Sequence, residues 1–286
     1  MKLKLLITLI IMTLTQLNAM SDNNIKSYMQ RYIENKMKAQ VNQIDIISNY
    51  PIEDAKGWNV YFLSIKAKVK LGNSYQEATI PQTVFVKGNR ITLKLLKKGK
   101  LNKDGKREKG KNYAKLLKPK VPIEAYNSKH FISGSENAPH KILIFTDPFC
   151  PHCKRKIREV LSIVNHNPEK YALYYYHFPL VKIHPASDVT TKAMHVLQKR
   201  GDITDMLKLY YLPIKAKETN IDKILKAINN KTGVTITKEE INSPETQKAI
   251  NFDKAMGRRL QIASTPTIFI DGKWDRTRKE YKKYAR

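Results

Sequence analysis

Apolar residues recur at intervals of three and four between residues 25 and 37, and this period predicts a helix that packs by one face. Beyond residue 60 the period becomes two. Residues 61–71 alternate apolar with polar side chains and predict a half-buried strand, and residues 83–86 predict another. A Gly-Asn pair follows the second strand and precedes a third alternating run, which is typical of a hairpin. We therefore expect residues 21–100 to form a small domain with one helix and an antiparallel sheet.

The second half of the chain alternates short apolar strands with helical stretches, a pattern that is typical of α/β layer folds. Strands are expected at residues 141–146, 171–177 and 267–270. Helices are expected at residues 187–199, 202–211, 220–231, 238–260 and 276–284. The intervening residues 101–135 are charged and contain glycine and proline, so we expect a basic linker there and a second domain over residues 136–286.

The first twenty residues have the layout of a secretory signal peptide. Lys2 and Lys4 precede an apolar run over residues 5–14, and Leu17-Asn18-Ala19 has the small final residue expected at the end of a cleavage site. The apolar run is about half the length of a membrane-spanning helix. We expect removal of residues 1–20 and a protein that works beyond the inner membrane; the alternative is an uncleaved N-terminal anchor.

The chain is strongly basic, with a formal net charge of +28 over 286 residues. The segment from Lys87 to Lys120 contains fourteen Lys or Arg residues and only two acidic residues. Such a charge favours acidic partners, anionic lipid or nucleic acid, yet no nucleic-acid-binding module is visible in the sequence. The basic segment is interpreted as a solvated hairpin and linker, with a specific anion site as the alternative.

The only two cysteines are Cys150 and Cys153, which excludes a disulfide-stapled scaffold. The motif Cys150-Pro151-His152-Cys153 stands where a predicted strand gives way to a predicted helix. Unpaired backbone N–H groups and the helix dipole at that position stabilise a thiolate, and Pro151 is well tolerated in a first helical turn. We therefore expect Cys150 to be an accessible thiol of lowered pKa and Cys153 to be the buried, resolving thiol.

Basic residues follow the motif immediately, and His152 adds a hydrogen-bond donor. We expect the positive potential of these side chains to lower the pKa of Cys150 further. They are Lys154, Arg155, Lys156 and Arg158.

Two other interpretations of the Cys-x-x-Cys pair stay open at this point. A zinc site needs four ligands, but there is no second such pair, and the seven histidines form no pair at zinc-finger spacing. Two unreactive thiols are the other alternative. We expect no metal, and we interpret His177, His184 and His195 as structural or solvated.

The segment from Ile144 to Cys153, Ile-Phe-Thr-Asp-Pro-Phe-Cys-Pro-His-Cys, resembles the active-site strand and loop of the bacterial Dsb family of thiol–disulfide interchange proteins. The approach Thr-Asp-Pro-Phe is similar to the DsbC/DsbG branch, whereas Pro-His between the cysteines is similar to DsbA. Ser264-Thr265-Pro266-Thr267 resembles the loop that carries the family's cis-proline. An ordinary trans proline that opens a strand is the alternative for Pro266.

The resemblance implies an α+β protein with an N-terminal dimerisation domain, a linker and a C-terminal thioredoxin-like catalytic domain with a helical insertion. It implies a periplasmic homodimer that needs no cofactor, with unfolded or misfolded exported proteins and a resetting membrane redox protein as partners. Thr265 and Pro266 would bind an extended substrate strand. Ile144 replaces the buried acid of DsbA, and the second disulfide of DsbC is absent, so the sequence resembles a hybrid of the two branches.

These observations predict a protein that forms or rearranges disulfides in exported proteins through Cys150 and Cys153. Net oxidation competes with isomerisation or reduction as its main activity. The alternative from a different functional class is a periplasmic chaperone that mainly binds unfolded chains, with redox activity as a secondary property.

Overall fold

The computed structural model describes residues 20–71, 74–99 and 101–285. The predicted signal peptide therefore lies, except for Met20, outside the described residues. The chain divides after Pro119 into two compact units, each with its own core. Within the described ranges, no helix is long and apolar enough to cross a membrane.

The N-terminal unit consists of a helix, a four-stranded antiparallel sheet in the order β1-β2-β3-β4, and a small hairpin made by β5 and β6. In chain order its elements are α2 (Asp22–Met37), β1 (Gln40–Pro51), β2 (Asn59–Leu71), β3 (Ser74–Lys87), β4 (Arg90–Thr92), β5 (Leu96–Lys97), β6 (Lys111–Asn112) and η1 (Tyr113–Lys115).

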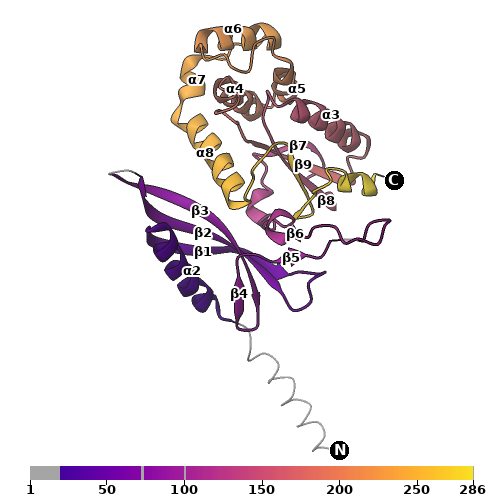
Figure 1. Ribbon diagram of the computed structural model, residues 1–286. Helices are drawn as coiled ribbons and strands as arrows, with labels where there is room; N and C mark the ends of the chain where they lie inside the picture. Colours follow the sequence, from indigo (N-terminus) through magenta and orange to yellow (C-terminus); the bar gives the residue numbers. More distant parts are fainter. Residues whose placement is uncertain (1–19, 72–73, 100, 286) are drawn as a thin grey trace, which may run out of the picture. The chain divides into compact units, whose positions relative to one another are not determined.

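Helix α2 lies along one face of this sheet, as Figure 1 shows. Ser21 caps the helix by accepting a hydrogen bond from the Asn24 N–H group. Ile25, Met29 and Ile33 are buried against the sheet, so the apolar period of the sequence is the face that packs. The predicted helix-and-sheet domain is thereby confirmed.

The second unit has a five-stranded sheet in the order β11-β10-β8-β9-β7, in which only β8 and β9 are parallel. Its elements are η2 (Ile123–Ala125), β7 (Phe131–Gly134), β8 (His140–Thr146), α3 (Pro151–His166), β9 (Tyr171–His177), α4 (Ser187–Arg200), α5 (Ile203–Lys208), η3 (Leu209–Tyr211), α6 (Ile221–Thr232), α7 (Lys238–Asn242), α8 (Pro244–Arg259), β10 (Thr267–Ile270), β11 (Lys273–Trp274) and η4 (Glu280–Tyr284).

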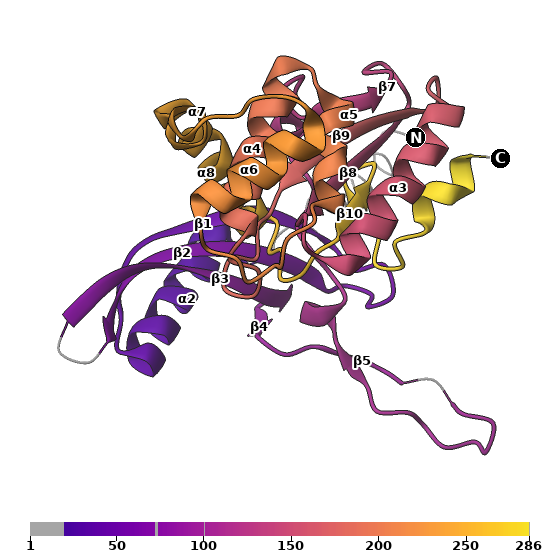
Figure 2. The ribbon, with the colours of Figure 1, turned by 90° about the horizontal axis from the view of Figure 1, so that it is seen from above.

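Strand β8 is buried on both faces, and its side chains divide between two cores. Ile142 and Ile144 face the core that is shared with α3, α4 and α6, whereas Leu143 and Phe145 face the core on the other side, where α8 packs. This alternation follows from the two-residue period of a strand. Figure 2 shows α4 and α6 next to each other, with α3 apart from them toward the right of the view. The predicted mixed α/β fold of the second domain, with its added helices, is confirmed.

The expected linker over residues 101–135 is not a separate segment. Residues 101–119 belong to the N-terminal unit, where β5, β6 and η1 are formed, and residues 120–135 belong to the second unit, where β7 joins the sheet. The expectation was wrong because charged residues and glycines also build exposed hairpins. Strand β7 is only four residues long and too short to show a period.

Two predicted helices differ from the helices of the structure. The helix expected over residues 238–260 ends at Asn242 and a new one starts at Pro244, because proline lacks the N–H group that continues a helix. The helix expected over residues 276–284 is a short 3-10 helix from Glu280 to Tyr284. Asp275 instead holds a turn there, accepting hydrogen bonds from the Thr277 hydroxyl and the Glu280 N–H group.

Candidate active site

The two cysteines lie at the start of α3, directly after the loop that leaves β8. Cys150 is the N-cap residue with an extended backbone, Pro151 is in the first turn, and Cys153 is one turn on. Both cysteines are free thiols. Cys153 is completely buried and Cys150 is 7% exposed, so Cys150 is the more accessible thiol but less open than the sequence predicted.

The loop before β10 covers Cys150. Strand β10 pairs antiparallel with β8, with Thr267 opposite Phe145, and this places residues 264–266 beside the cysteine loop. The Cys150 Sγ lies 3.5 Å from the Thr265 carbonyl oxygen. The Thr265–Pro266 bond is cis, as the sequence led us to expect. The structure therefore brings Thr265 and Cys150 together although 115 positions separate them in the sequence.

The two thiols have opposite electrostatic environments. A hydrogen bond from the Cys153 side chain, with further hydrogen bonds from backbone N–H groups, lowers the pKa of Cys150 from 9.0 to about 5 against the opposing effect of burial. The neighbouring Thr265 side chain lowers the pKa of Cys150 further, as a smaller contribution. Burial raises the pKa of Cys153 far above its ordinary value. Cys150 is therefore a thiolate at neutral pH and Cys153 a thiol.

The basic residues after the motif do not account for this low pKa. Lys154 lies over the Tyr211 ring at 3.9 Å, and Lys156 forms an ion pair with Glu159. The Arg155 guanidinium donates to the Nδ1 atom of His152 at 2.9 Å. Because arginine only donates, Nδ1 accepts, and the proton of a neutral His152 is on Nε2. The expectation about Cys150 was right in direction, but the chief cause is Cys153 and not these cations.

Asp147 organises the loop that precedes the cysteines. Its carboxylate is fully buried and accepts hydrogen bonds from the backbone N–H groups of Phe149 and Leu180, at 2.8 and 2.6 Å. The Ser187 hydroxyl and the His184 Nδ1 atom also contact it. The Asp147 N–H group points at the Cys153 Sγ at 3.5 Å. Asp147 thus connects the cysteine loop to the segment between β9 and α4.

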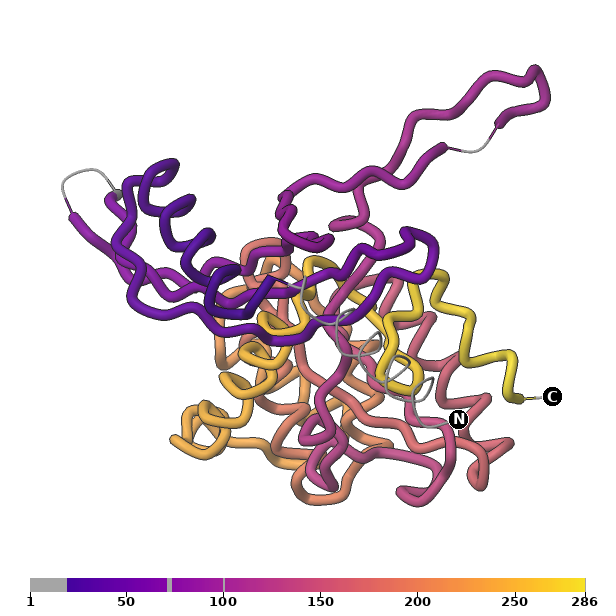
Figure 3. The backbone as a smooth tube through the Cα atoms, turned by 90° about the horizontal axis from the view of Figure 1, so that it is seen from below, coloured from indigo at the N-terminus to yellow at the C-terminus, as the bar shows by residue number. Residues whose placement is uncertain are grey.

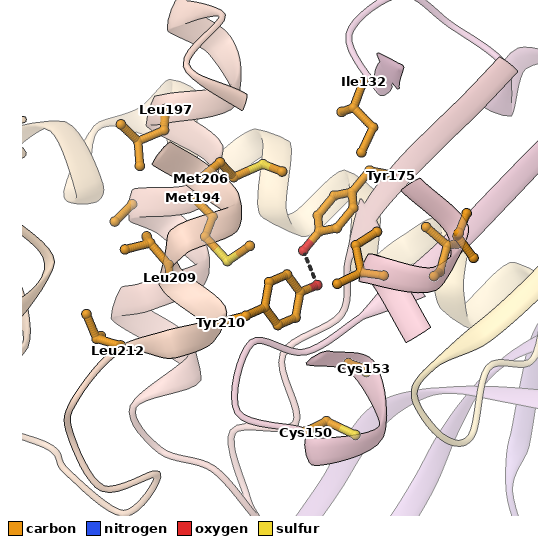
Figure 4. Packing of buried hydrophobic residues seen from close by; sticks show 14 of the residues in the cluster. Ile132, Cys150, Cys153, Tyr175, Met194, Leu197, Met206, Leu209, Tyr210 and Leu212 are labelled. Carbon is orange, nitrogen blue, oxygen red and sulfur yellow. Dashed lines mark hydrogen bonds between the residues drawn. The ribbon is translucent and has the colours of Figure 1, made fainter. Parts of the chain in front are cut away.

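Three buried hydroxyl groups form a ring near Cys153. The Thr146 hydroxyl lies 2.7 Å from that of Tyr175 and 2.5 Å from that of Tyr210, and the two tyrosine hydroxyls are 2.7 Å apart. Figure 4 shows the two tyrosines near the cysteines. Burial is the main reason that the pKa values of both tyrosines lie above their ordinary value, so these groups stay protonated. The three hydroxyl groups satisfy one another's hydrogen bonds inside the core. In the same core, Ile144 stands where the resemblance to DsbA implies a buried acid.

Sequence motifs pointed to the cysteines, His152 and the Thr265–Pro266 loop, but no motif pointed to Asp147 or the tyrosines as parts of the site. One feature of the sequence could have indicated Asp147: it is a single acidic residue directly after a mostly apolar strand. Of the three histidines interpreted as structural or solvated, burial lowers the pKa values of His177 and His195, and His184 contacts the Asp147 carboxylate. Among the residues that the structure describes, no cluster of three His, Cys, Asp or Glu side chains is arranged to hold a metal ion.

Comparison with known proteins places this half of the chain in a family. Residues 127–286, more than half of the sequence, match the family model described as thioredoxin. No curated protein matches the chain.

Similar solved structures include a thioredoxin-like oxidoreductase from Silicibacter pomeroyi, with 20% identity, coverage of 54% of this chain and 87% of that chain, and a TM-score of 0.44. Another is oxidised BdbD from Bacillus subtilis, with 16% identity, 58% and 92% coverage, and a TM-score of 0.48. A third is the thiol-disulfide exchange protein alpha-DsbA2 from Wolbachia pipientis, with 15% identity, 57% and 88% coverage, and a TM-score of 0.42. By its family match, the chain belongs to the thioredoxin family.

Proposed function

We propose that the protein is a thiol–disulfide oxidoreductase that forms and rearranges disulfide bonds in exported proteins through Cys150 and Cys153. One observation carries the proposal: a Cys150 thiol with a pKa of about 5 starts a helix, and a buried thiol of raised pKa lies one turn further on. A reactive, partly exposed thiolate beside a buried resolving thiol is the arrangement that disulfide exchange requires.

In the reducing direction, the Cys150 thiolate attacks one sulfur of a substrate disulfide. A mixed disulfide forms, and the other substrate sulfur leaves as a thiolate. Cys153 then attacks the Cys150 sulfur, its proton passes to a departing substrate thiolate, and the reduced substrate leaves the Cys150–Cys153 disulfide behind. Two electrons move from the cysteine pair to the substrate, and the reverse sequence oxidises a substrate dithiol.

The exposed carbonyl and N–H groups of an extended substrate need partners while the mixed disulfide exists. Thr265 suits this role because its carbonyl oxygen lies 3.5 Å from the attacking sulfur. A substrate strand that pairs with the backbone there holds its own cysteine against Cys150. Recognition through the backbone accepts many sequences, as a general folding enzyme needs to do.

The low pKa of Cys150 supports an oxidising couple. A stabilised thiolate favours the reduced protein, so the disulfide form readily gives up its bond to substrates. The N-terminal unit supports the proposed rearrangement of disulfide bonds. It holds a helix and a sheet but no cysteine, so its role is not in the redox chemistry itself. We assign to it homodimerisation, which would provide two redox sites for rearranging misfolded chains in the periplasm. A membrane redox protein would reset the cysteine pair.

Two assays on one preparation test this function: refolding of reduced ribonuclease and reactivation of scrambled ribonuclease. The wild-type protein should accelerate both, and Cys150→Ser should reduce both to the uncatalysed rate. Cys153→Ser should accumulate a mixed disulfide with substrate, visible on a non-reducing gel. Ser162→Ala, on the exposed side of the same helix, is the matched control and should keep full activity. Equal rates for wild type and Cys150→Ser would refute the proposal.

A further inference from the structure

The segment between β5 and β6 is an organised, exposed arm of the N-terminal unit. Leu96 and Lys97 pair with Asn112 and Lys111, and a further bridge joins Leu101 to Arg107. Every residue from 101 to 109 is exposed. Figure 3 traces the segment as a long loop that extends away from the strands at its base.

The base of the arm is fixed to the sheet. Tyr113 is buried in the core of the unit, packs on Phe85, and donates a hydrogen bond from its hydroxyl to the Asp54 carboxylate at 2.8 Å. Asp54 also forms an ion pair with Lys97. The arm therefore leaves the sheet from an anchored position.

The tip is a defined turn. The Asn102 side-chain oxygen accepts hydrogen bonds from the N–H groups of Asp104 and Lys106, and the Asn102 N–H group donates to the Lys106 carbonyl oxygen. Gly105 has a φ of +74°, a left-handed conformation that glycine adopts without strain. These hydrogen bonds define the turn, and the side chains of residues 101–109 are exposed around it.

The arm carries a large excess of positive charge. Residues 96–112 contain eight Lys or Arg and two acids. Within the described ranges, no carboxylate lies within ion-pairing distance of Lys103, Lys106 or Lys109, so their charges are uncompensated. Leu101 is 61% exposed near the tip, and Leu96 is 52% exposed at the base. Exposed leucines among cations form an amphipathic surface.

We infer that this arm docks the protein on an anionic lipid surface, with the lysines against the headgroups and Leu101 in the headgroup–acyl boundary. Lysines attract anionic bilayers, and an exposed leucine gains free energy by leaving water at such an interface. A polyanion such as DNA would satisfy the lysines but not Leu101. The arm also lacks aromatic residues on which the bases of single strands would stack. The docking is independent of the redox chemistry.

Charge removal at the tip is the first test, with the full chain and vesicles of known composition. Wild type should bind vesicles that contain phosphatidylglycerol and not vesicles of phosphatidylcholine alone. The variant Lys103→Gln/Lys106→Gln/Lys109→Gln should bind roughly 100-fold more weakly, because each charge near the surface contributes about a fivefold factor. The control Lys217→Gln/Lys226→Gln/Lys248→Gln removes equal charge from other exposed positions and should lose less than about threefold.

Leucine removal is the second test, because it leaves the net charge unchanged. Leu101→Ser should weaken vesicle binding about tenfold, since the serine has little apolar area to bury. Equal losses in the two lysine variants would mean general attraction to a basic protein and would overturn the assignment, as would unchanged binding by Leu101→Ser. Binding to duplex DNA that depends on the arm and is tighter than binding to vesicles would also overturn the assignment.

Discussion

Replacing Cys153 with alanine tests the origin of the Cys150 reactivity. The pKa of Cys150 is lowered from 9.0 to about 5, and the largest cause is the hydrogen bond from Cys153. A difference of about 4 pH units corresponds to roughly 5 kcal/mol in favour of the thiolate. A hydrogen bond to a charged group contributes about 1.5–3 kcal/mol of this, which is about one to two pH units. The Cys150 pKa in Cys153→Ala should therefore rise to about 6–7.

Cys153→Ser is the matched control, because its hydroxyl keeps a donor at the same position. Its Cys150 pKa should stay within about one pH unit of the wild-type value. The ultraviolet absorbance of the thiolate measures both values, and each variant has a single thiol to titrate. Identical pKa values in the alanine and serine variants would refute the role given to the Cys153 hydrogen bond. A value near that of an unperturbed cysteine, about 8.5–9, in the wild type would refute the low pKa itself.

Four further outcomes follow from the structure. Thr265→Val should raise the Cys150 pKa by less than Cys153→Ala does, since the Thr265 hydroxyl is a smaller contributor than Cys153; a larger rise in the same titration would reverse that order. The reduced protein should gain about 2 kcal/mol in its free energy of unfolding between pH 5 and pH 7, because the folded pKa of Cys150 lies below the unfolded value and its contribution is lost as the pH falls toward 5. Urea unfolding of reduced wild type and Cys150→Ser checks this, and equal pH profiles would contradict it. Asp147→Ala should cost about 3 kcal/mol or more, since it leaves buried donors without an acceptor, whereas Asp222→Ala on the surface should cost less than about 0.5 kcal/mol; urea midpoints give both, and similar losses would be inconsistent with the contacts of Asp147. Deleting residues 21–119 should convert a dimer to a monomer that keeps dithiol chemistry, and sedimentation of a monomeric full-length protein would rule this out.

The strands and helices that the sequence predicted well have an uninterrupted apolar pattern, either periodic or continuous. Strand β9 was predicted with the bounds that the structure gives, because all seven of its residues are buried and apolar or aromatic side chains dominate it. Strand β1 was missed. It has bulges between Val41 and Gln43 and between Ile46 and Ser48, and each bulge shifts the alternation by one residue. Most of its side chains are only half-buried, so the apolar signal is also weak.

The candidate site was predictable where the chemistry is local. Cys150, Pro151 and Cys153 occupy consecutive positions of one loop and helix, and their spacing specifies the geometry. Asp147, in contrast, acquires its role from Leu180, His184 and Ser187, which only the folded chain brings to it. Lys156 shows the opposite case: its nearness in sequence suggested an effect on Cys150, but its side chain pairs with Glu159 instead.

The reduction potential of the Cys150–Cys153 pair tests the central claim most directly. Equilibration of the purified protein with known ratios of reduced and oxidised glutathione gives this potential. Because the Cys150 thiolate is stabilised, we predict a value well above the about −270 mV of thioredoxin and toward the about −120 mV of DsbA. A potential at or below that of thioredoxin, or a pair that does not equilibrate with glutathione, would contradict the account.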